Sequence, residues 1–573
     1  MSPADGALRA PPARPGALAL GIPAAAVRPA VVWVLLGLAS AAVMLPRLVS
    51  PSFGLLDDGL IPVVSAMPMP EASWTFDRGY GRLRPLFWLW LAAEYRAWGA
   101  SPRAFFLALC AALAITAVLV SESVALAARD RLTGLLAGLG FLLAPPAVEN
   151  YYTVSKSEPW VVLALVLSVY LLLRALDVAE RDPRTSRRHL AASALVLLAA
   201  YFWKETAQAM LIASGLWFAG AWVRDRRVSR PLTRIALAYL LVNIGCAALY
   251  WAAFALSGTA SIGAGTYSAH YQLTADTMVK GALRQLGFLV RDFPLLLVAG
   301  AVWAVRDAAG IGARSHDARS LAWASAAWMG AWIAILLPWR ATFEYHLLPL
   351  AAGAAALTAV ALRPLFRATD GRALRRRWLM LAAAAALTLA VLVNNATNGQ
   401  IQIAVDGSNA DMMEFVAAVA PRGATVLVNL TPGSEYVSEL RDHLAEFRGR
   451  PDLRVKALRG AGPAAVALIL HPLMRQQPTP AVRLGFGEGD TQTRTAELAR
   501  WRSHEPVLVY RRTRDVPMFD VALQDVVCPL LLVAGVRDGV ACGAARPFVD
   551  RRTLQYGWEV YRIGPPDPSA NYS

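Results

Sequence analysis

The stretch AVVWVLLGLASAAVMLPRL (residues 30–48) has no acidic side chain and is about long enough to cross a bilayer as a helix. A secretory signal would also be apolar here. Many further apolar segments follow it along the chain. Their number favours an uncleaved first membrane helix over a signal that is removed.

Composition points to a membrane protein along the whole chain. Of 573 residues, 56% are hydrophobic and only 17% are charged, whereas a soluble domain carries about 25% charged residues. The formal net charge is +16, but the basic residues cluster in short runs between apolar segments, which is typical of cytoplasmic membrane loops. We therefore expect membrane lipids, and no nucleic acid, as partners.

The apolar segments predict about eleven membrane spans. The loop 49–84 follows the first span, and the aromatic, amphipathic segment 85–98 is expected to lie at the membrane interface. The later spans are expected near 103–127, 132–146, 159–176, 190–203, 206–223, 235–256, 284–305, 320–338, 346–362 and 379–395.

Orientation follows from the arginines. The loops 177–189, 224–234, 306–319 and 363–378 are strongly basic, so they and the tail 1–28 are expected in the cytoplasm. An odd number of spans then places residues 396–573 outside. Arg is used almost everywhere in place of Lys, and Ala and Leu are abundant, as in a high-GC bacterial gene. We expect a multi-pass protein of the bacterial cytoplasmic (inner) membrane.

The predicted fold class is mainly α: a polytopic membrane domain over 29–395, with an outer loop at 49–84, followed by an extracytoplasmic α/β domain over 396–573. In the last part, short apolar runs alternate with polar stretches containing Gly and Pro, which is typical of strands and helices in a small mixed domain. Cys528 and Cys542 lie there and could form a disulfide outside the cell. Cys110 and Cys246 lie in apolar segments and are expected to be core residues.

Ionisable residues gather in the loops predicted to lie outside. Charged groups near membrane depth are costly, so each is a functional candidate, although interfacial anchors and hairpin caps can look the same. Cations suit the phosphate of a lipid, and carboxylates suit a general base or a divalent metal. These candidates are Asp57, Asp58, Arg82, Arg84, Glu149, Lys156, Glu158, Lys204, Glu205, Arg340, Glu344 and His346.

Several short motifs, in this order, resemble the GT-C superfamily of integral-membrane glycosyltransferases, which use polyprenyl-phosphate-linked sugars. Asp57-Asp58 is similar to the acidic motif of the first outer loop, and GRLRPLFWLW (81–90) to the Arg-Pro-Leu motif that closes it. PPAVENYYTVSKSEPW (145–160) is similar to the second-loop pattern. YFWKETA (201–207) and FEYHLLPL (343–350) resemble segments of the protein O-mannosyltransferase-like branch.

This resemblance covers roughly residues 30–362 and implies a transfer reaction. Asp57 or Asp58 would be the general base for an acceptor hydroxyl, or a ligand of a metal that activates it. The donor phosphate would be held by Arg82, Arg84, Lys204 and Arg340. The sugar and acceptor pocket would be shaped by Glu149, Lys156, Glu158, Glu205, Glu344 and His346. The acceptor would be an extracytoplasmic glycan, lipid or protein.

Some features stay open. Relatives differ in whether a divalent cation, Mg²⁺ or Mn²⁺, takes part. The chain lacks tetratricopeptide repeats and a WWDYG-type string, so neither relative's acceptor carries over. The alternatives are a transporter or flippase of lipid-linked sugars, another lipid-linked group transferase, and a scaffold anchored by the membrane part.

Overall fold

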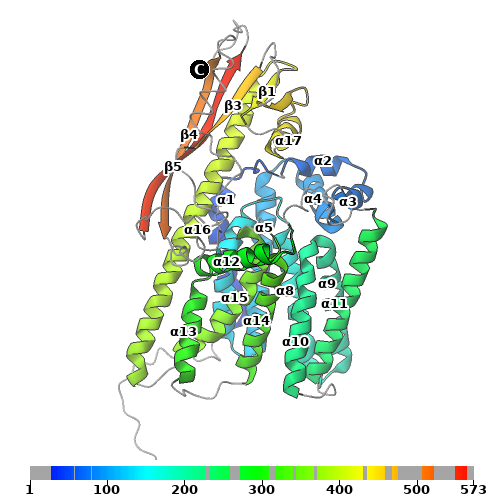
Figure 1. The fold of residues 1–573 in the computed structure, drawn as a ribbon, viewed down its shortest axis with the longest axis vertical. Helices are drawn as coiled ribbons and strands as arrows, with labels where there is room; N and C mark the ends of the chain where they lie inside the picture. Colours follow the sequence, from blue (N-terminus) through cyan, green and yellow to red (C-terminus); the bar gives the residue numbers. More distant parts are fainter. Residues whose placement is uncertain are drawn as a thin grey trace, which may run out of the picture.

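The computed structural model has two parts, a bundle of long helices and a β-sheet beyond one end of it (Figure 1). We call that end the sheet end of the bundle; α2, α3 and α4 lie there. The structure describes residues 28–56, 58–78, 81–225, 231–258, 271–308, 316–339, 344–366, 371–429, 435–458, 467–474, 506–521 and 549–563.

The helices of the bundle and its loops are α1 (Pro29–Val49), α2 (Leu60–Ala66), α3 (Glu71–Thr75), α4 (Pro85–Trp98), α5 (Pro102–Ala128), α6 (Arg131–Leu142), α7 (Pro145–Tyr151), α8 (Glu158–Val178), α9 (Pro183–Trp203), η3 (Glu205–Gln208), α10 (Ala209–Asp225), α11 (Pro231–Leu256), α12 (Ala275–Asp292), α13 (Leu295–Ala308), α14 (His316–Leu336), η4 (Glu344–Leu347), α15 (Leu348–Leu362), η5 (Arg363–Phe366) and α16 (Gly371–Val419). The remaining elements are β1 (Thr425–Val428), α17 (Glu435–Asp442), η6 (His443–Phe447), β2 (Arg454–Ala457), β3 (Ala467–Met474), β4 (Val507–Val521) and β5 (Val549–Ile563).

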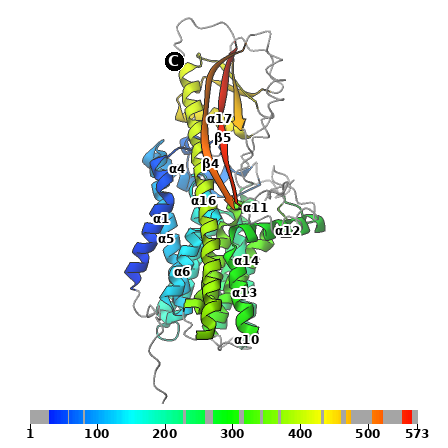
Figure 2. The ribbon, with the colours of Figure 1, turned by 90° about the vertical axis from the view of Figure 1, so that its left-hand side faces the viewer.

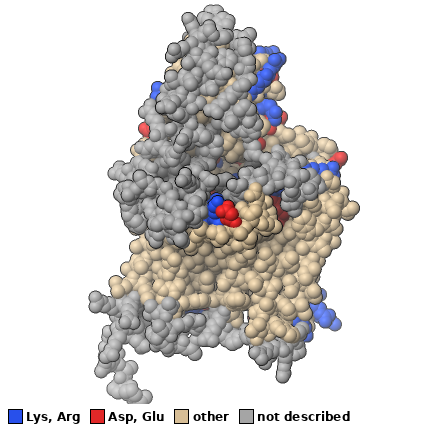
Figure 3. Space-filling view, viewed as in Figure 1, with Lys and Arg blue, Asp and Glu red and all other residues tan. Residues whose placement is uncertain are grey.

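Membrane-spanning helices dominate the bundle. Within the described ranges, seven helices are long and apolar enough to cross a membrane, or nine if each of two bent pairs is one span. Figure 3 shows a broad band of uncharged surface across the bundle, with most of the charged side chains near its upper and lower margins. The predicted fold class, a mainly α polytopic protein with a C-terminal α/β part, is confirmed.

Two of the expected spans are bent helix pairs. The apolar segment 284–305 is not one helix, because α12 and α13 meet at 92° across Phe293 and Pro294. The helix α12 lies across the bundle and projects from its side (Figure 2). The segment 132–146 likewise divides into α6 and α7, bent by 58°. Proline explains both breaks, since it lacks the N–H that an interior helical bond needs.

Small residues let neighbouring helices approach closely. A Cβ added at Gly134 would lie 2.5 Å from the Ser121 carbonyl oxygen, and one at Gly138 would lie 3.0 Å from the Ala117 carbonyl oxygen. These two glycines, four residues apart on α6, form a small-xxx-small face against α5. Alanine at Gly134 would force these two helices apart.

The helix α16 connects the two parts of the molecule. It runs from the bundle past position 395 to Val419 and continues beside the sheet (Figures 1 and 2). Arg47 near the end of α1 makes a buried ion pair with Asp406 of α16. Asn409, one turn further on, accepts hydrogen bonds from Tyr556 Oη at 3.1 Å and Trp558 Nε1 at 2.9 Å. The same turn of α16 therefore contacts both the bundle and the sheet.

The sheet has five strands in the order β2-β1-β3-β5-β4. The first three are parallel, with α17 in the connection between β1 and β2, while β5 is antiparallel to both β3 and β4. Apolar residues from one face pack on α16, including Val426, Leu468 and Trp558, which are buried. Whether residues 396–573 form a separate extracytoplasmic domain stays a prediction.

Candidate functional site

Asp58 ties the first loop to a second loop. Its side chain is fully buried, and its two carboxylate oxygens accept hydrogen bonds from the backbone N–H of Gly54 at 2.7 Å and of Ser155 at 3.0 Å. Such bonds fix the loop 51–58 against the turn that carries Lys156. Asp57, the predicted base, lies outside the described residues.

Arg84 makes a bidentate ion pair within its own loop. Its Nε and Nη2 donate to the two oxygens of Asp77 at 2.7 and 3.0 Å, and Trp88 Nε1 donates to the same carboxylate at 2.8 Å. Burial alone would raise the pKa of the Asp77 carboxyl, but the Arg84 guanidinium outweighs burial and holds that pKa below its ordinary value. Asp77 was not among the sequence candidates; an acid seven residues before the Arg-Pro-Leu motif was the available signal.

Arg82 reaches another part of the chain. Its Nε and Nη2 contact Glu205 Oε1 at 2.9 and 2.7 Å, which joins the first loop to η3. The second oxygen, Glu205 Oε2, is buried without a hydrogen-bond partner. One oxygen of this carboxylate is thus left for a donor that the described residues do not provide.

Lys204 and Glu158 form an ion pair that is almost completely buried. The side chains are 7% and 4% exposed, and Lys204 Nζ donates to Glu158 Oε1. Lys204 stands between α9 and η3, with its own N–H bonded to the Ala200 carbonyl. An ammonium has three N–H donors, so this pair leaves two of them for other acceptors.

Three tryptophan rings from α4, α8 and α9 contact one another, and two of them stand next to the residues of this ion pair in the sequence. Trp160 lies two residues after Glu158, and Trp203 immediately precedes Lys204. The ring centroids of Trp90, from α4, lie 4.8 Å from Trp160 and 6.0 Å from Trp203. This aromatic group was not predicted, although all three rings stand within the motif segments.

The turn before α8 and the 3-10 helix η4 complete the group. Lys156 Nζ lies 3.7 Å from the ring centroid of Tyr345, and the backbone carbonyl of Tyr345 accepts from Asn150 Nδ2 at 2.9 Å. The centroid of the half-buried His346 ring lies 4.0 Å from that of the Tyr345 ring. The charges that act on the His346 imidazole are those of Lys204, Glu158, Lys156 and Arg82.

The structure therefore brings six predicted residues into one network at the sheet end of the bundle: Arg82, Lys156, Glu158, Lys204, Glu205 and His346. Glu149 lies on α7 within reach of the Lys156 charge, and its Oε2 is buried without a partner. Arg340, Cys528, Cys542 and the side chain of Glu344 lie outside the described residues. Cys110 and Cys246 are free thiols on α5 and α11.

The described residues do not form a metal site. They contain no group of three or more His, Cys, Asp or Glu side chains placed to hold an ion. Both oxygens of Asp58 already accept backbone N–H groups. The participation of a divalent cation in the reaction stays a prediction.

A bundle of apolar helices with a charged first loop and paired charges at one end defines a polytopic membrane protein with a charged site at one end of its helices. No protein-family profile and no curated protein matches the sequence. Among solved structures, that of ArnT from Cupriavidus metallidurans bound to undecaprenyl phosphate has a TM-score of 0.51 and 14% identity, over 84% of this chain and 96% of that chain.

Two further structures are similar at lower scores. The apo state of the same ArnT has a TM-score of 0.48 and 14% identity, over 84% of this chain and 97% of that one. An Archaeoglobus fulgidus oligosaccharyltransferase tethered with an acceptor peptide has a TM-score of 0.45 and 13% identity, over 75% and 64%. The likeness to undecaprenyl-phosphate-bound ArnT confirms the predicted GT-C fold and leaves the O-mannosyltransferase-like branch a prediction.

Proposed function

We propose that the protein is a membrane glycosyltransferase that moves a sugar from a polyprenyl-phosphate donor to a hydroxyl of an acceptor. The observation that carries this proposal is the network at the sheet end, where the Lys204 ammonium donates to Glu158 and the carboxylate of the adjacent Glu205 keeps one buried oxygen without a partner among the described residues. Such a site offers cations for a phosphate and acceptors for sugar hydroxyls. The fold shared with ArnT, whose structure holds undecaprenyl phosphate, agrees with this reading.

The reaction exchanges one bond at the anomeric carbon. The Asp57 carboxylate takes the proton of the acceptor hydroxyl as the oxygen attacks that carbon. The bond from the carbon to the phosphate oxygen breaks, and the polyprenyl phosphate leaves with the bonding electron pair. Cations already in place at the leaving phosphate stabilise the charge that develops there.

The cations have unequal roles in this proposal. Lys204 is the first choice for the leaving phosphate because most of its donors remain for a ligand. Arg82 and Arg340 would support it, with Arg82 also holding Glu205 in place. Arg84 is committed to Asp77 and positions the loop rather than the donor.

Sugar hydroxyls would be bound by the carboxylates. The buried oxygens Glu149 Oε2 and Glu205 Oε2 can each accept a hydroxyl proton, which would satisfy groups that the described chain leaves without a partner. Glu158, Lys156, Glu344 and His346 would shape the pocket. The Trp160 and Trp203 rings would offer apolar faces to the sugar.

We also propose the location of the protein. The bacterial inner membrane, a cytoplasmic N-terminus and a sheet on the outer side agree with the basic loops on the opposite side of the predicted spans. The acceptor would then be a glycan, lipid or protein of the cell envelope.

The decisive variant is Asp57→Asn in membranes supplied with a radiolabelled polyprenyl-phosphate sugar and envelope extract. It removes the base without changing size, so label transfer is expected to fall at least about 100-fold. Asp276→Asn is the matched control, since Asp276 is 70% exposed and pairs only with Lys280 of its own helix. Transfer by Asp57→Asn at the rate of the control would refute the role of Asp57, and transport of donor across liposomes without any transfer would refute the transferase.

A further inference from the structure

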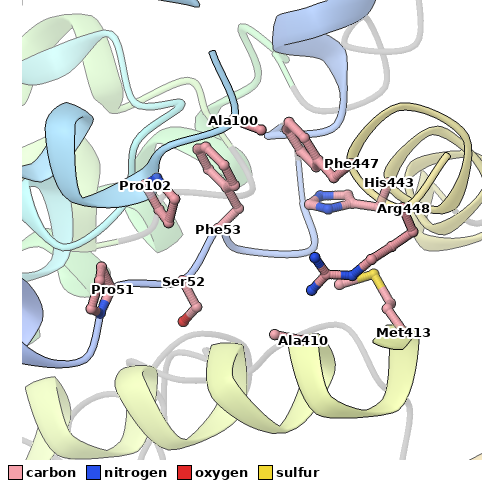
Figure 4. A pocket seen from close by; sticks show the side chains of 10 residues that line it. All are labelled: Pro51, Ser52, Phe53, Ala100, Pro102, Ala410, Met413, His443, Phe447 and Arg448. Carbon is pink, nitrogen blue, oxygen red and sulfur yellow. The ribbon is translucent and has the colours of Figure 1, made fainter. Parts of the chain in front are cut away.

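A cavity with a mainly apolar lining and a few polar groups lies where the bundle meets α16 and η6. Its volume is about 240 Å³, and it shares no lining residue with the network at the sheet end. Four segments enclose it: the loop after α1, the start of α5, the facing side of α16, and η6 with Arg448 (Figure 4). We call it the junction pocket and define it by Ser52, Phe53, His443, Phe447 and Arg448.

Three polar atoms in the junction pocket are buried without a hydrogen-bond partner: Ser52 Oγ, His443 Nε2 and Arg448 Nε. His443 is 1% exposed, and no carboxylate forms an ion pair with Arg448 within the described part of the chain. In Figure 4 the Arg448 guanidinium points into the cavity, and Ser52 lies on its opposite side. Buried polar atoms are nearly always satisfied, so three together indicate a ligand that supplies the missing bonds.

The protonation state of His443 defines what it can bind. Burial and the neighbouring Arg448 charge lower the pKa of His443 to about 3, so the imidazole is neutral at physiological pH. The backbone groups of Gly54 and Leu55 lie beside the imidazole and act to raise its pKa, but burial outweighs them. A neutral imidazole whose Nδ1 carries the proton accepts at Nε2, and this atom therefore needs a hydroxyl donor.

Arg448 and the aromatic rings set two further requirements for a ligand of the junction pocket. An unpaired guanidinium favours an anionic oxygen. Phe53 and Phe447 stack at 4.6 Å between centroids, giving one apolar wall that fits C–H groups. The volume is below the roughly 300–1,000 Å³ of usual small-molecule sites, so the pocket fits a small molecule or one headgroup rather than a lipid chain.

We propose that the junction pocket binds a small hydroxylated anion of the polyol phosphate class, with its anionic oxygens on Arg448 and Ser52 and a hydroxyl donating to His443 Nε2. The proposal does not depend on the glycosyltransferase reaction. The bound anion would link η6 to the loop that leads to Asp58, because Ser52 and Phe53 directly precede Gly54, whose N–H holds that carboxylate. The ligand could be free or be the headgroup of a lipid such as phosphatidylglycerol.

Binding is tested on the purified full-length protein by thermal unfolding and by isothermal titration. We expect sn-glycerol 3-phosphate to raise the melting temperature by a few °C over sodium chloride of equal ionic strength. Inorganic phosphate, which has no carbon-bound hydroxyl, should bind about 10-fold more weakly. Equal binding of the two anions would overturn the role given to His443.

A second arm separates the two sources of the anion. Protein in nanodiscs containing phosphatidylglycerol is compared with protein in phosphatidylcholine nanodiscs. Stabilisation by the soluble ester supports a free ligand, and stabilisation only by phosphatidylglycerol supports a lipid headgroup. No effect in either arm overturns the proposal.

Single substitutions test whether the anion binds in the junction pocket. Arg448→Met should weaken binding at least about 10-fold, while Arg441→Met should not change it, because Arg441 is 57% exposed on α17 and pairs with Asp442. Full binding by Arg448→Met overturns the proposal. If Arg448→Met does not fold, Ser52→Ala decides, since it removes only one hydroxyl; undiminished binding by Ser52→Ala would equally overturn it.

Discussion

The network at the sheet end and the junction pocket are both polar, but they satisfy their charges differently. In the network, Arg82 and Lys204 each face a carboxylate of the same chain, and Arg84 in the first loop faces Asp77. In the junction pocket, Arg448 and His443 face a cavity and keep atoms without partners. Paired charges hold loops together whether or not a ligand is present, whereas unpaired groups lower stability until a ligand binds. Removing one member of a buried pair in the network should therefore lower the stability of the protein strongly. Removing Arg448 from the junction pocket without ligand should change the stability little or raise it.

The largest effect is expected from breaking the buried pair of Glu158 and Lys204. Glu158→Gln leaves a buried ammonium without its carboxylate and should destabilise the protein by about 3–5 kcal/mol. Equilibrium unfolding in SDS measures this loss of stability. The double variant Glu158→Gln/Lys204→Met should lose less than the sum of the single variants, because both members of the pair are gone.

A surface pair provides the control for this cycle. Lys280→Met breaks the 2.8 Å contact with Asp276 between half-exposed and exposed side chains, and it should cost under about 1 kcal/mol. A loss in Glu158→Gln no larger than in Lys280→Met would show that the buried pair does not hold the loops together.

A somewhat smaller effect is expected at Asp77. Asp77→Asn removes the bidentate partner of Arg84 and should cost about 2–3 kcal/mol at pH 7. Because the folded pKa of Asp77 is below its unfolded value, its contribution is full above about pH 4 and disappears as the pH falls through the folded pKa. The gap between wild type and Asp77→Asn should therefore narrow on acidification, and a gap independent of pH would contradict this assignment.

Glu94 should respond in the opposite direction. Burial on α4 raises the pKa of Glu94 to about 8. A raised folded pKa favours the protonated carboxyl, so its stability contribution is full below about pH 4 and is lost as the pH rises to 8. Glu94→Gln should melt at the same temperature as wild type near pH 5 and several °C higher at pH 9. Equal melting temperatures at pH 9 would argue that Glu94 is solvated.

The smallest effect is expected in the empty junction pocket. Without ligand, Arg448→Met removes a cation that has no ion-pair partner, so the free energy of unfolding should change by under about 1 kcal/mol or rise. A loss as large as that of Glu158→Gln, measured in the same detergent, would mean that Arg448 is part of the structural framework.

Sequence reasoning predicted the helices best where apolar length and helix signals coincide. The expected segments 85–98 and 103–127 correspond to α4 and α5, each starting at a proline in the first turn. It did not predict the bends within 132–146 and 284–305, because hydropathy averages over the prolines and is not sensitive to a bend. It also ended the last span near 395, whereas α16 continues as a polar helix supported by the sheet.

Sequence reasoning identified the charged residues of the candidate site, but it did not predict which of them pair. Charged residues in the loops of the sheet end were found because a charge beside an apolar segment is conspicuous. Asp77 was overlooked, and so were the tryptophans at 90, 160 and 203, since an acid in a loop or an indole in an apolar helix has no distinctive local pattern. His443 and Arg448 were not found either, because their significance depends on a cavity between segments that are distant in sequence.

The sequence by itself determined that this is a membrane bundle with charges collected in particular loops, because apolar length and charge are properties of contiguous residues. Only the tertiary structure decided which charges pair. The partners of Lys204, Arg82 and Arg47 lie 46, 123 and 359 positions away. Contact over such separations depends on how helices pack, and a linear pattern contains no measure of that distance.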